Sequence, residues 1–200
     1  MKIIAISQKV KIEEFGEVVT QLDTRLFNYF QRAGILIIGI PFIVKNKKIN
    51  YISTKKFLDH LRLDGLILSG GDDIGKKPLR DSLEYFLISY FKKKNKPILG
   101  ICRGMQIIAK KFGSELKKIN GHVKKIHNVK QKGLQKKVIC YHNYTIKSCP
   151  KNFDTEYYSS DGCIESFISK NKKIKGIMWH PERLKFFDKR DLKEIKNYFK

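Results

Sequence analysis

Short apolar segments alternate with longer segments of helical period in the first half of the chain. Four continuous apolar runs predict buried strands, at residues 2–6, 35–40, 66–68 and 97–101. Between these runs, apolar residues recur every three or four positions, which predicts helices at residues 18–32, 79–94 and 104–112. Alternation of this kind is typical of a parallel, doubly wound sheet with right-handed connections. Binding sites in such sheets lie beyond the carboxyl ends of the strands.

The pattern changes after residue 114. Short β-like segments separated by turn residues are predicted at residues 115–119, 138–141, 144–147, 163–169 and 174–178, and an amphipathic helix at 189–199. Residues 124–137 are polar and basic, which predicts a surface loop. Because we find no linker and no internal repeat, we expect a single domain spanning residues 1–200. Its predicted fold class is α/β: a flavodoxin-like, doubly wound, mostly parallel sheet flanked by helices, with a small β-rich insertion in the C-terminal half.

Composition narrows the class of protein. Hydrophobic residues make up 42% of the 200 positions, enough to form a core in a chain of this length. No apolar run approaches the roughly 20 residues of a membrane-spanning helix, and the first residues are apolar too briefly for a signal peptide. We therefore expect a cytoplasmic protein with no membrane partner. The four cysteines form no Cys-x-x-Cys pair, so neither disulfides nor a zinc site is predicted from them.

The chain is strongly basic, with a formal net charge of +23. Such a charge favours an anionic partner: nucleic acid, a membrane surface or a phosphorylated substrate. The lysines, however, are scattered along the whole chain, and abundant isoleucine and asparagine indicate a general bias in composition. No aromatic–basic module or helix-turn-helix pattern accompanies them. We therefore expect no nucleic-acid partner and leave an anionic small substrate open.

The predicted strand at 97–101 runs into the sequence Gly-Ile-Cys-Arg-Gly at residues 100–104. A nucleophile on such a strand-to-helix turn is held clear of the backbone, as is the serine of the Gly-x-Ser-x-Gly nucleophile elbow. The flanking glycines let the turn close. The amides at the start of the following helix point at the sulfur and favour the thiolate over the thiol. Cys102 is therefore a candidate nucleophile.

A histidine and a carboxylate follow the predicted strand at 174–178. In an extended segment, residues two positions apart point to the same side, so Glu182 can hold His180 in one tautomer. Together with Cys102 they would form a Cys–His–Glu triad. A lone histidine is more often structural, so a catalytic role for His180 is supported only by the presence of Cys102 and Glu182.

Tandem glycines, Gly70 and Gly71, follow the predicted strand at 66–68. Their backbone amides, with the amide of Arg103, can form an oxyanion hole. The alternative is an ordinary Gly-Gly turn.

The remaining titratable residues carry weaker signals. His122 and His127 lie five residues apart in a turn-rich segment, and no carboxylate or cysteine is close by in the sequence, so we predict no metal site. Asp161 and Gly162 are typical of a turn. Glu165 is interpreted as a charge on the face of a strand.

Three motifs together resemble the class I glutamine amidotransferase-like proteins, and most closely their γ-glutamyl hydrolase branch. They are the elbow segment at 97–106, Gly-Gly-Asp-Asp-Ile at 70–74 and Trp-His-Pro-Glu at 179–182, in matching order and spacing. Further matches are Arg-Asp-x-x-Glu at 80–84, Asn-Gly-His at 120–122 and Asp-Gly-x-x-Glu at 161–165. The resemblance is weakest before residue 63 and between residues 124 and 137.

The resemblance implies a role for each matching residue. Cys102 would be the nucleophile, His180 the general base and acid, and Glu182 the partner that orients His180. Gly71 and Arg103 would donate the oxyanion amides. The residues implied in substrate binding are Gly70, Gln106, Tyr141, His142 and Asn143. The chemistry implied is hydrolysis of a γ-glutamyl amide through a γ-glutamyl thioester, with no metal and no organic cofactor.

Several functions stay open at this stage. The leading one is a stand-alone hydrolase acting on a small γ-glutamyl substrate, such as γ-glutamyl-γ-aminobutyrate. One alternative is a glutaminase subunit that delivers ammonia to a synthetase partner, and another is a non-enzymatic relative that only binds a ligand. A homodimer is compatible with each.

The short segment at 75–79 and the basic charge suggest an anionic leaving group. An example is the nucleotide phosphoramidate of the γ-glutamyl-CDP-amidate hydrolases of bacterial capsule biosynthesis, which the chain also resembles. The phosphate would then contact lysines near the site: Lys76, Lys77, Lys124 or Lys125.

Overall fold

The computed structural model describes residues 1–131 and 133–200. Its helices are α1 (Thr24–Arg32), α2 (Tyr51–His60), α3 (Pro78–Lys93), α4 (Arg103–Lys111), the 3₁₀ helix η1 (Pro181–Arg183) and α5 (Lys189–Tyr198). Its strands are β1 (Lys2–Ile6), β2 (Lys9–Ile12), β3 (Val18–Gln21), β4 (Ile35–Gly39), β5 (Val44–Lys45), β6 (Lys48–Ile49), β7 (Gly65–Leu68), β8 (Ile98–Ile101), β9 (Leu116–Lys118), β10 (Val123–Gln131), β11 (Leu134–Tyr141), β12 (Tyr144–Ile146), β13 (Phe153–Ser159), β14 (Ile164–Ser169) and β15 (Ile174–Ile177).

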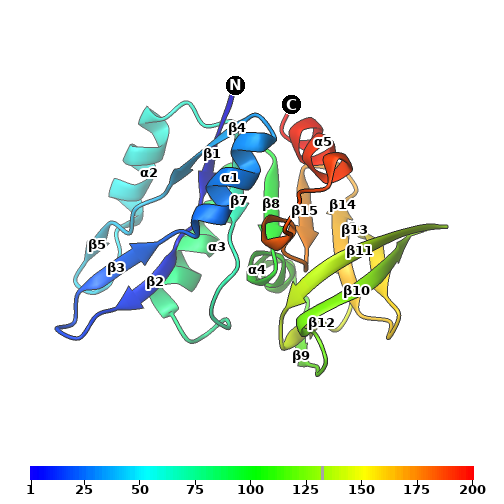
Figure 1. Ribbon diagram of the computed structural model, residues 1–200. Coiled ribbons are helices and arrows are strands. Elements are labelled where there is room, and N and C mark those ends of the chain that lie inside the picture. The colour runs from blue at the N-terminus through cyan, green and yellow to red at the C-terminus, as the bar shows by residue number, and fades with distance from the viewer. Residues whose placement is uncertain (132) are drawn as a thin grey trace.

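The main sheet has the order β11-β10-β13-β14-β15-β8-β7-β1-β4 (Figure 1). The five strands from β15 to β4 are parallel. If these five strands are numbered in chain order and read across the sheet from β4 to β15, their order is 2-1-3-4-5, which is the flavodoxin order. The predicted α/β fold is therefore confirmed. In this arrangement β7, β8 and β15 are neighbours, so the segments that follow them meet at one edge of the sheet.

Helices cover both faces of the parallel strands. In Figure 1, α1 and α5 lie in front of the sheet, and α3 and α4 lie behind it. Successive side chains of β1 alternate between the two cores: Ile4 and Ile6 pack with α1 and α5, whereas Ala5 packs with α2, α3 and α4. Within the described part of the chain, no helix is both long enough and apolar enough to cross a membrane.

The second half of the chain extends the same sheet with antiparallel strands. From β15 outward, β14, β13, β10 and β11 pair antiparallel. The predicted loop at 124–137 is wrong, because β10 and β11 form a hairpin there; position 132 of that prediction lies outside the described residues. The hairpin carries charged residues on both faces, so the apolar alternation that marks a strand is weak. Strand β13 was not predicted either.

The predicted helix at 18–32 also needs correction. Its first four residues form β3, which pairs with β2 in a separate hairpin. The helix starts at Thr24 because the Asp23 side chain caps it, accepting a hydrogen bond from the Arg25 amide at 3.0 Å. The β-branched residues Val18, Val19 and Thr20 favour the strand.

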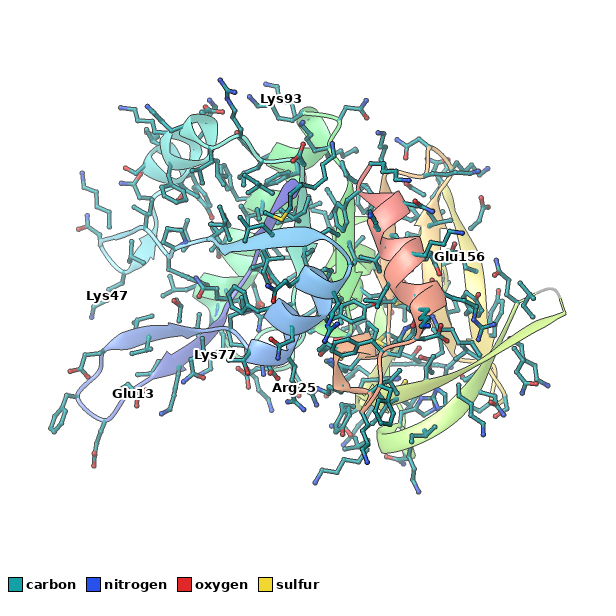
Figure 2. All side chains as sticks on the ribbon, turned by 45° about the horizontal axis from the view of Figure 1, so that its top comes forward. Glu13, Arg25, Lys47, Lys77, Lys93 and Glu156 are labelled. Carbon is teal, nitrogen blue, oxygen red and sulfur yellow. The ribbon has the colours of Figure 1, made fainter. Side chains whose placement is uncertain are left out.

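Basic side chains are spread around the molecule. Figure 2 labels three lysines that lie well apart on the molecule: Lys47 between β5 and β6, Lys77 before α3, and Lys93 at the end of α3. This distribution favours a bias in composition over a continuous surface for nucleic acid.

Candidate active site

Cys102 sits on the turn between β8 and α4. It is the N-cap of α4 and has φ +53° and ψ −108°, a backbone conformation that non-glycine residues adopt at a cost of about 1–3 kcal/mol. The surrounding backbone fixes it: the Cys102 amide donates to the Ile177 carbonyl at 2.7 Å, and the Gln106 amide donates to the Cys102 carbonyl at 3.1 Å. This is the strained geometry of a nucleophile elbow.

Close packing at the elbow requires its two glycines. A Cβ atom on Gly104 would lie 2.0 Å from the Leu68 carbonyl oxygen, and one on Gly100 would lie 2.4 Å from the Gly104 carbonyl carbon. Strands β7 and β8 and the start of α4 therefore touch through their backbones. That contact sets the position of Cys102 relative to the loop that follows β7.

His180 and Glu182 lie directly after β15. His180 Nδ1 is 2.6 Å from Glu182 Oε1, and both side chains are buried. The other edge of the imidazole faces the glycine loop: a Cβ atom on Gly70 would lie 3.4 Å from His180 Nε2 and 3.7 Å from Cys102 Cβ. The imidazole and the cysteine thus meet beside Gly70. The His180 main chain is anchored through its amide, which donates to the Ile139 carbonyl of β11 at 2.9 Å.

The charge state of His180 follows from these neighbours. Burial lowers the pKa of His180, but the neighbouring Cys102 and the hydrogen-bonded Glu182 outweigh burial and raise it from 6.5 to about 9. His180 therefore holds its proton at neutral pH.

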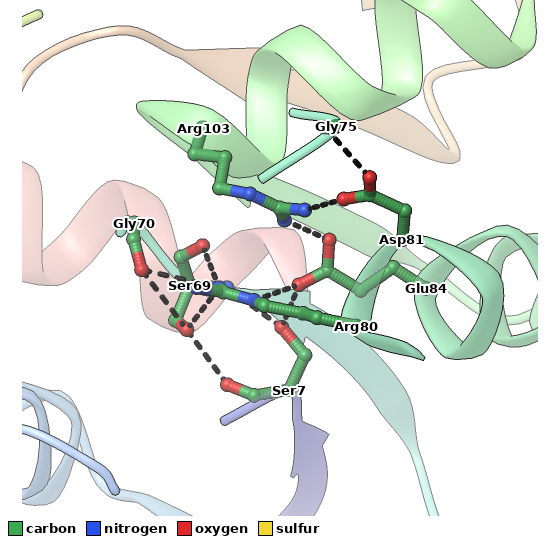
Figure 3. Close-up of polar contacts among 8 residues, drawn as sticks. All are labelled: Ser7, Ser69, Gly70, Gly75, Arg80, Asp81, Glu84 and Arg103. Carbon is green, nitrogen blue, oxygen red and sulfur yellow. Dashed lines mark hydrogen bonds and ion pairs between the residues drawn. The ribbon is translucent and has the colours of Figure 1, made fainter. Parts of the chain in front are cut away.

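A buried polar network supports the Gly70–Gly71 loop (Figure 3). The Arg80 guanidinium donates to the carbonyls of Ser69 at 2.7 Å and Gly70 at 3.1 Å. Because the C=O and N–H of a trans peptide point in opposite directions, the Gly71 amide is directed away from Arg80. Gly71 has φ +150°, and a Cβ atom there would lie 2.3 Å from Arg80 Nη1, so no larger residue fits.

The same network reaches the elbow through Glu84. Glu84 accepts from Arg80 Nε at 2.9 Å, from the Ser7 hydroxyl at 2.8 Å, and from the Arg103 guanidinium; Arg103 also binds Asp81. Burial raises the pKa of Glu84, but Arg80 and Arg103 outweigh it and hold the pKa below its usual range. The sequence pattern at 80–84 carried no assigned role. The structure shows that it ties α3 to both the glycine loop and the first residue of α4.

Three of the predicted substrate residues lie at this site. Gln106, one turn after Cys102, donates to the Tyr144 carbonyl at 3.0 Å and lines a cavity of about 310 Å³ together with Lys76 and Lys110. The Tyr141 ring packs edge-on against His180, with ring centroids 5.8 Å apart. Gly70 lies against His180, as described above.

The other two predicted substrate residues, His142 and Asn143, have different surroundings. Asn143 is exposed, and its carbonyl accepts from the Ile119 amide at 2.9 Å. His142 is buried and faces His122 and Glu165. Their part in substrate binding stays a prediction.

The interpretation of Glu165 as a charge on a strand face is wrong. Glu165 is fully buried and faces His122, His127 and His142, and the Cys140 thiol is 3.5 Å from its Oε2. The sequence argument against a metal at His122 and His127, that no carboxylate or cysteine lies near them, therefore does not hold in three dimensions. The Asn-Gly-His and Asp-Gly-x-x-Glu motifs were the only sequence signal of this cluster, and their separation in the chain concealed that they meet.

The chain belongs to the glutamine amidotransferase class-I family, whose model matches residues 20–191. It is 35% identical over 138 residues to the gamma-glutamyl-CDP-amidate hydrolase of Campylobacter jejuni, a match that covers 64% of this chain and 66% of that protein. It is also 35% identical over 133 residues to a glutamine-hydrolyzing GMP synthase subunit of Methanococcus aeolicus, covering 62% of this chain and 67% of that one. The chain thus matches about two thirds of the length of each relative.

Solved structures share the fold. A glutamine amidotransferase from Thermotoga maritima superposes with a TM-score of 0.65 at 20% identity, covering 90% of this chain and 76% of that one. A candidate GMP synthase subunit from Thermoplasma acidophilum superposes with a TM-score of 0.72 at 24% identity, covering 100% and 92%.

Proposed function

We propose that the protein is a stand-alone cysteine hydrolase that cleaves a γ-glutamyl amide and releases glutamate and an amine. The observation that carries the proposal is the meeting of three groups: Cys102 on a strained elbow, His180 beside it, and Glu182 bound to the far side of the imidazole at 2.6 Å. This is the arrangement of a nucleophile, a base and an orienting carboxylate. Membership of the glutamine amidotransferase class-I family supports it.

The first half of the reaction forms a thioester. The Cys102 thiolate attacks the γ-carbonyl carbon, and the developing oxyanion is held by the amides of Gly71 and Arg103. Loss of one such donor costs about 3–4 kcal/mol in typical cases. The imidazolium of His180 gives its proton to the amide nitrogen as the C–N bond breaks, and the γ-glutamyl group stays on the sulfur.

The second half returns the enzyme to its starting state. His180, now neutral, takes a proton from water, and the resulting hydroxide adds to the thioester carbonyl. The C–S bond breaks, the sulfur leaves as thiolate, and glutamate departs. Glu182 keeps Nδ1 of His180 protonated through both halves, so that Nε2 is the atom that gives and takes the proton.

The leaving group is the finer part of the proposal: an anionic one, such as a nucleotide phosphoramidate. Lys76 and Lys110 line the cavity beside Gln106, and the Lys9 side chain lies against Gly71. Lys77 precedes α3, and Lys124 and Lys125 lie exposed on β10. The hydrolase from Campylobacter jejuni, named for γ-glutamyl-CDP-amidate, supports the same substrate class. γ-Glutamyl-γ-aminobutyrate is the second substrate to test. A role in capsule biosynthesis would follow only from activity on the nucleotide phosphoramidate.

The deciding experiment is a substrate panel with purified protein: glutamine, γ-glutamyl-γ-aminobutyrate and a γ-glutamylated cytidine diphosphoramidate. We expect glutamate release from the phosphorylated compound to exceed the other two by at least about tenfold in kcat/KM, equivalent to about 1.4 kcal/mol. Lys76→Ala should raise KM for the phosphorylated compound and leave glutamine turnover unchanged, with Lys47→Ala as the control at a distant edge. Equal rates on all three compounds would rule out the anionic leaving group and leave the hydrolase proposal standing.

A second candidate is a glutaminase subunit that passes ammonia to a synthetase. The likeness to the GMP synthase subunit of Methanococcus aeolicus favours it. A protein of this kind would be nearly silent on every compound of the panel when assayed alone, and glutamine turnover would rise on addition of the synthetase partner. Turnover by the protein alone on the phosphorylated compound would exclude this candidate.

A further inference from the structure

A second cluster of reactive side chains lies outside the proposed catalytic centre. His122 precedes β10, His127 lies within it, Cys140 and His142 lie at the end of β11, and Glu165 lies in β14. His122, His142 and Glu165 are at most 4% exposed, and the proposed reaction uses none of the five. Three imidazoles therefore surround one buried carboxylate with no assigned role.

The ligand atoms of this cluster have the spacing of a metal site. Glu165 Oε1 is 3.3 Å from His122 Nδ1, 3.5 Å from His142 Nε2 and 3.7 Å from His127 Nε2. In a tetrahedral zinc site with bonds of about 2.0–2.1 Å, neighbouring ligand atoms lie about 3.3 Å apart. His122 Nδ1, His142 Nε2 and Glu165 Oε1 all lie within 4.8 Å of one another, so one cation can reach these three atoms with modest shifts. His127 Nε2 instead groups with Cys140, whose Sγ is 3.4 Å away, and with Glu165.

The outer nitrogens of two imidazoles are held as in metal-binding histidines. His122 Nε2 is 2.8 Å from Asp161 Oδ2, and His142 Nδ1 is 3.0 Å from the Tyr144 carbonyl oxygen. A carbonyl oxygen only accepts, so His142 Nδ1 carries a hydrogen, and in the neutral ring Nε2 presents a lone pair to Glu165. Asp161 orients His122 in the same way. Hydrogen bonds of this kind to a carboxylate or a carbonyl typically fix the tautomer of a ligating histidine.

The inner atoms lack hydrogen bonds. Among the described residues, His122 Nδ1, His142 Nε2 and Glu165 Oε1 are buried and make no hydrogen bond of acceptable geometry. When both rings are neutral, their two lone pairs and the carboxylate oxygen repel one another unless a positive charge lies between them. A metal ion at their centre supplies that charge.

We propose that this cluster binds one divalent transition-metal ion, with zinc the best fit. The ligands are His122 Nδ1, His142 Nε2 and Glu165 Oε1. Two imidazoles and one carboxylate suit zinc, cobalt or nickel and not calcium or magnesium, which prefer oxygen ligands. The fourth tetrahedral position is left for a small ligand such as water.

The position of the cluster indicates that a bound metal would stabilise the β10–β11 hairpin. In the described residues, the β10–β11 hairpin joins the rest of the sheet through only two residue pairs of β10 with β13, Val129 with Ser159 and Lys130 with Tyr158. The metal links the base of this hairpin to β14. Tyr141, which packs on His180, lies directly before His142. Metal binding therefore stabilises the hairpin and fixes the side chain that borders the proposed base.

The test uses full-length protein carrying Cys102→Ser, freed of any affinity tag, so that metal cannot bind at Cys102 or to a tag. Elemental analysis of purified protein is expected to give about one zinc per chain. After chelation, Co²⁺ should restore one equivalent with the intense visible absorption of tetrahedral coordination, and zinc should raise the melting temperature. Less than about a tenth of an equivalent, no tetrahedral cobalt spectrum, or binding only at millimolar zinc would overturn the proposal.

Variants locate the site. His142→Ala and Glu165→Gln should weaken zinc binding by at least about 100-fold, and Asp161→Asn, which removes only the outer partner, by about 10-fold. His60→Ala is the matched control, since His60 is exposed at the end of α2 and bonds its own helix. Unchanged zinc affinity in His142→Ala and Glu165→Gln would overturn the assignment. Should these variants fail to fold, the zinc content and cobalt spectrum of the Cys102→Ser protein decide alone.

Discussion

The parallel and antiparallel halves of the sheet each bury a carboxylate among basic side chains. Beneath the elbow, Glu84 accepts hydrogen bonds from two guanidinium groups and a serine hydroxyl. In the antiparallel half, Glu165 faces three imidazoles, and its Oε1 makes no hydrogen bond of good geometry within the described residues. Guanidinium groups are always charged and have only donors, so they complete the Glu84 site by themselves.

The surroundings of each carboxylate determine what it can bind. A carboxylate saturated by arginine donors has no capacity for a further ligand, and the Glu84 network can only hold backbone in place. It holds the backbone that carries the proposed oxyanion amides. An imidazole with one nitrogen bonded outward still has a lone pair directed inward. The Glu165 cluster can therefore bind a metal cation, whereas the Glu84 network cannot.

The largest expected effect is the loss of glutamate release when Cys102, but not Cys149, is replaced. Cys102→Ala should lower glutamate release by at least about 10⁴-fold, as the loss of a nucleophile does in other triads. Cys149→Ala, a half-buried cysteine away from both clusters, should stay within about twofold of the wild type. Single-turnover assays with a γ-glutamyl substrate measure both. Turnover retained by Cys102→Ala would show that the elbow is not the nucleophilic site.

Most of the parallel half could be predicted from the sequence because its central strands β7 and β8 are buried on both faces, whereas the edge strand β4 exposes Leu36. Continuous apolar runs mark such strands, and the residues after them, Cys102, His180 and Gly70, are brought together by the strand order alone. The contact of Glu182 with His180 followed from their spacing of two. The support for the glycine loop could not be predicted, since Arg80 and Glu84 act through contacts between segments far apart in the chain.

The antiparallel half was harder to predict for physical reasons. Strands β10 and β11 have solvent on much of their surface, so lysines alternate with few apolar residues and the segment resembles a loop. The Glu165 cluster joins side chains from three separate strands or their ends. Nothing local in the sequence of His127 or Glu165 indicates that they meet.

The next largest effect concerns the proposed base. Glu182→Gln should lower kcat by about 10³-fold, because the imidazole loses the carboxylate that fixes its tautomer and stabilises its charge. In the wild type, the proton on His180 is lost as pH rises through about 9, so kcat/KM should fall above that pH. In Glu182→Gln the pKa of His180 is lower, and the fall should begin at lower pH. An alkaline limb that does not move in the variant would contradict the role of Glu182.

Stability should distinguish the two buried carboxylates. Glu84→Gln leaves the buried Arg80 without a counter-charge and Arg103 with Asp81 alone, and we expect it to lower the free energy of unfolding by about 3–5 kcal/mol. Glu165→Gln, measured in zinc-free protein, should lower the free energy of unfolding by only about 1–3 kcal/mol, since the imidazoles lose one polar partner and His122 keeps the Asp161 carboxylate. Urea titration of both variants gives the comparison. Equal losses of unfolding free energy in the two variants would contradict this difference between the clusters.

The smallest expected difference is between the stability losses of two glycine variants, one in each half of the sheet. Gly104→Ala forces a Cβ atom to within 2.0 Å of the Leu68 carbonyl oxygen, so backbone must move and stability should fall by about 3 kcal/mol, with loss of activity as the elbow shifts. Gly162, in the turn before β14, has φ +80° and open space around it, so Gly162→Ala should cost only the roughly 1–2 kcal/mol of a left-handed alanine, about half as much, and leave activity intact. Thermal unfolding and glutamate release measure both variants. If Gly162→Ala is as damaging as Gly104→Ala, the antiparallel half is packed as tightly as the elbow and is not the looser region that a bound metal would stabilise.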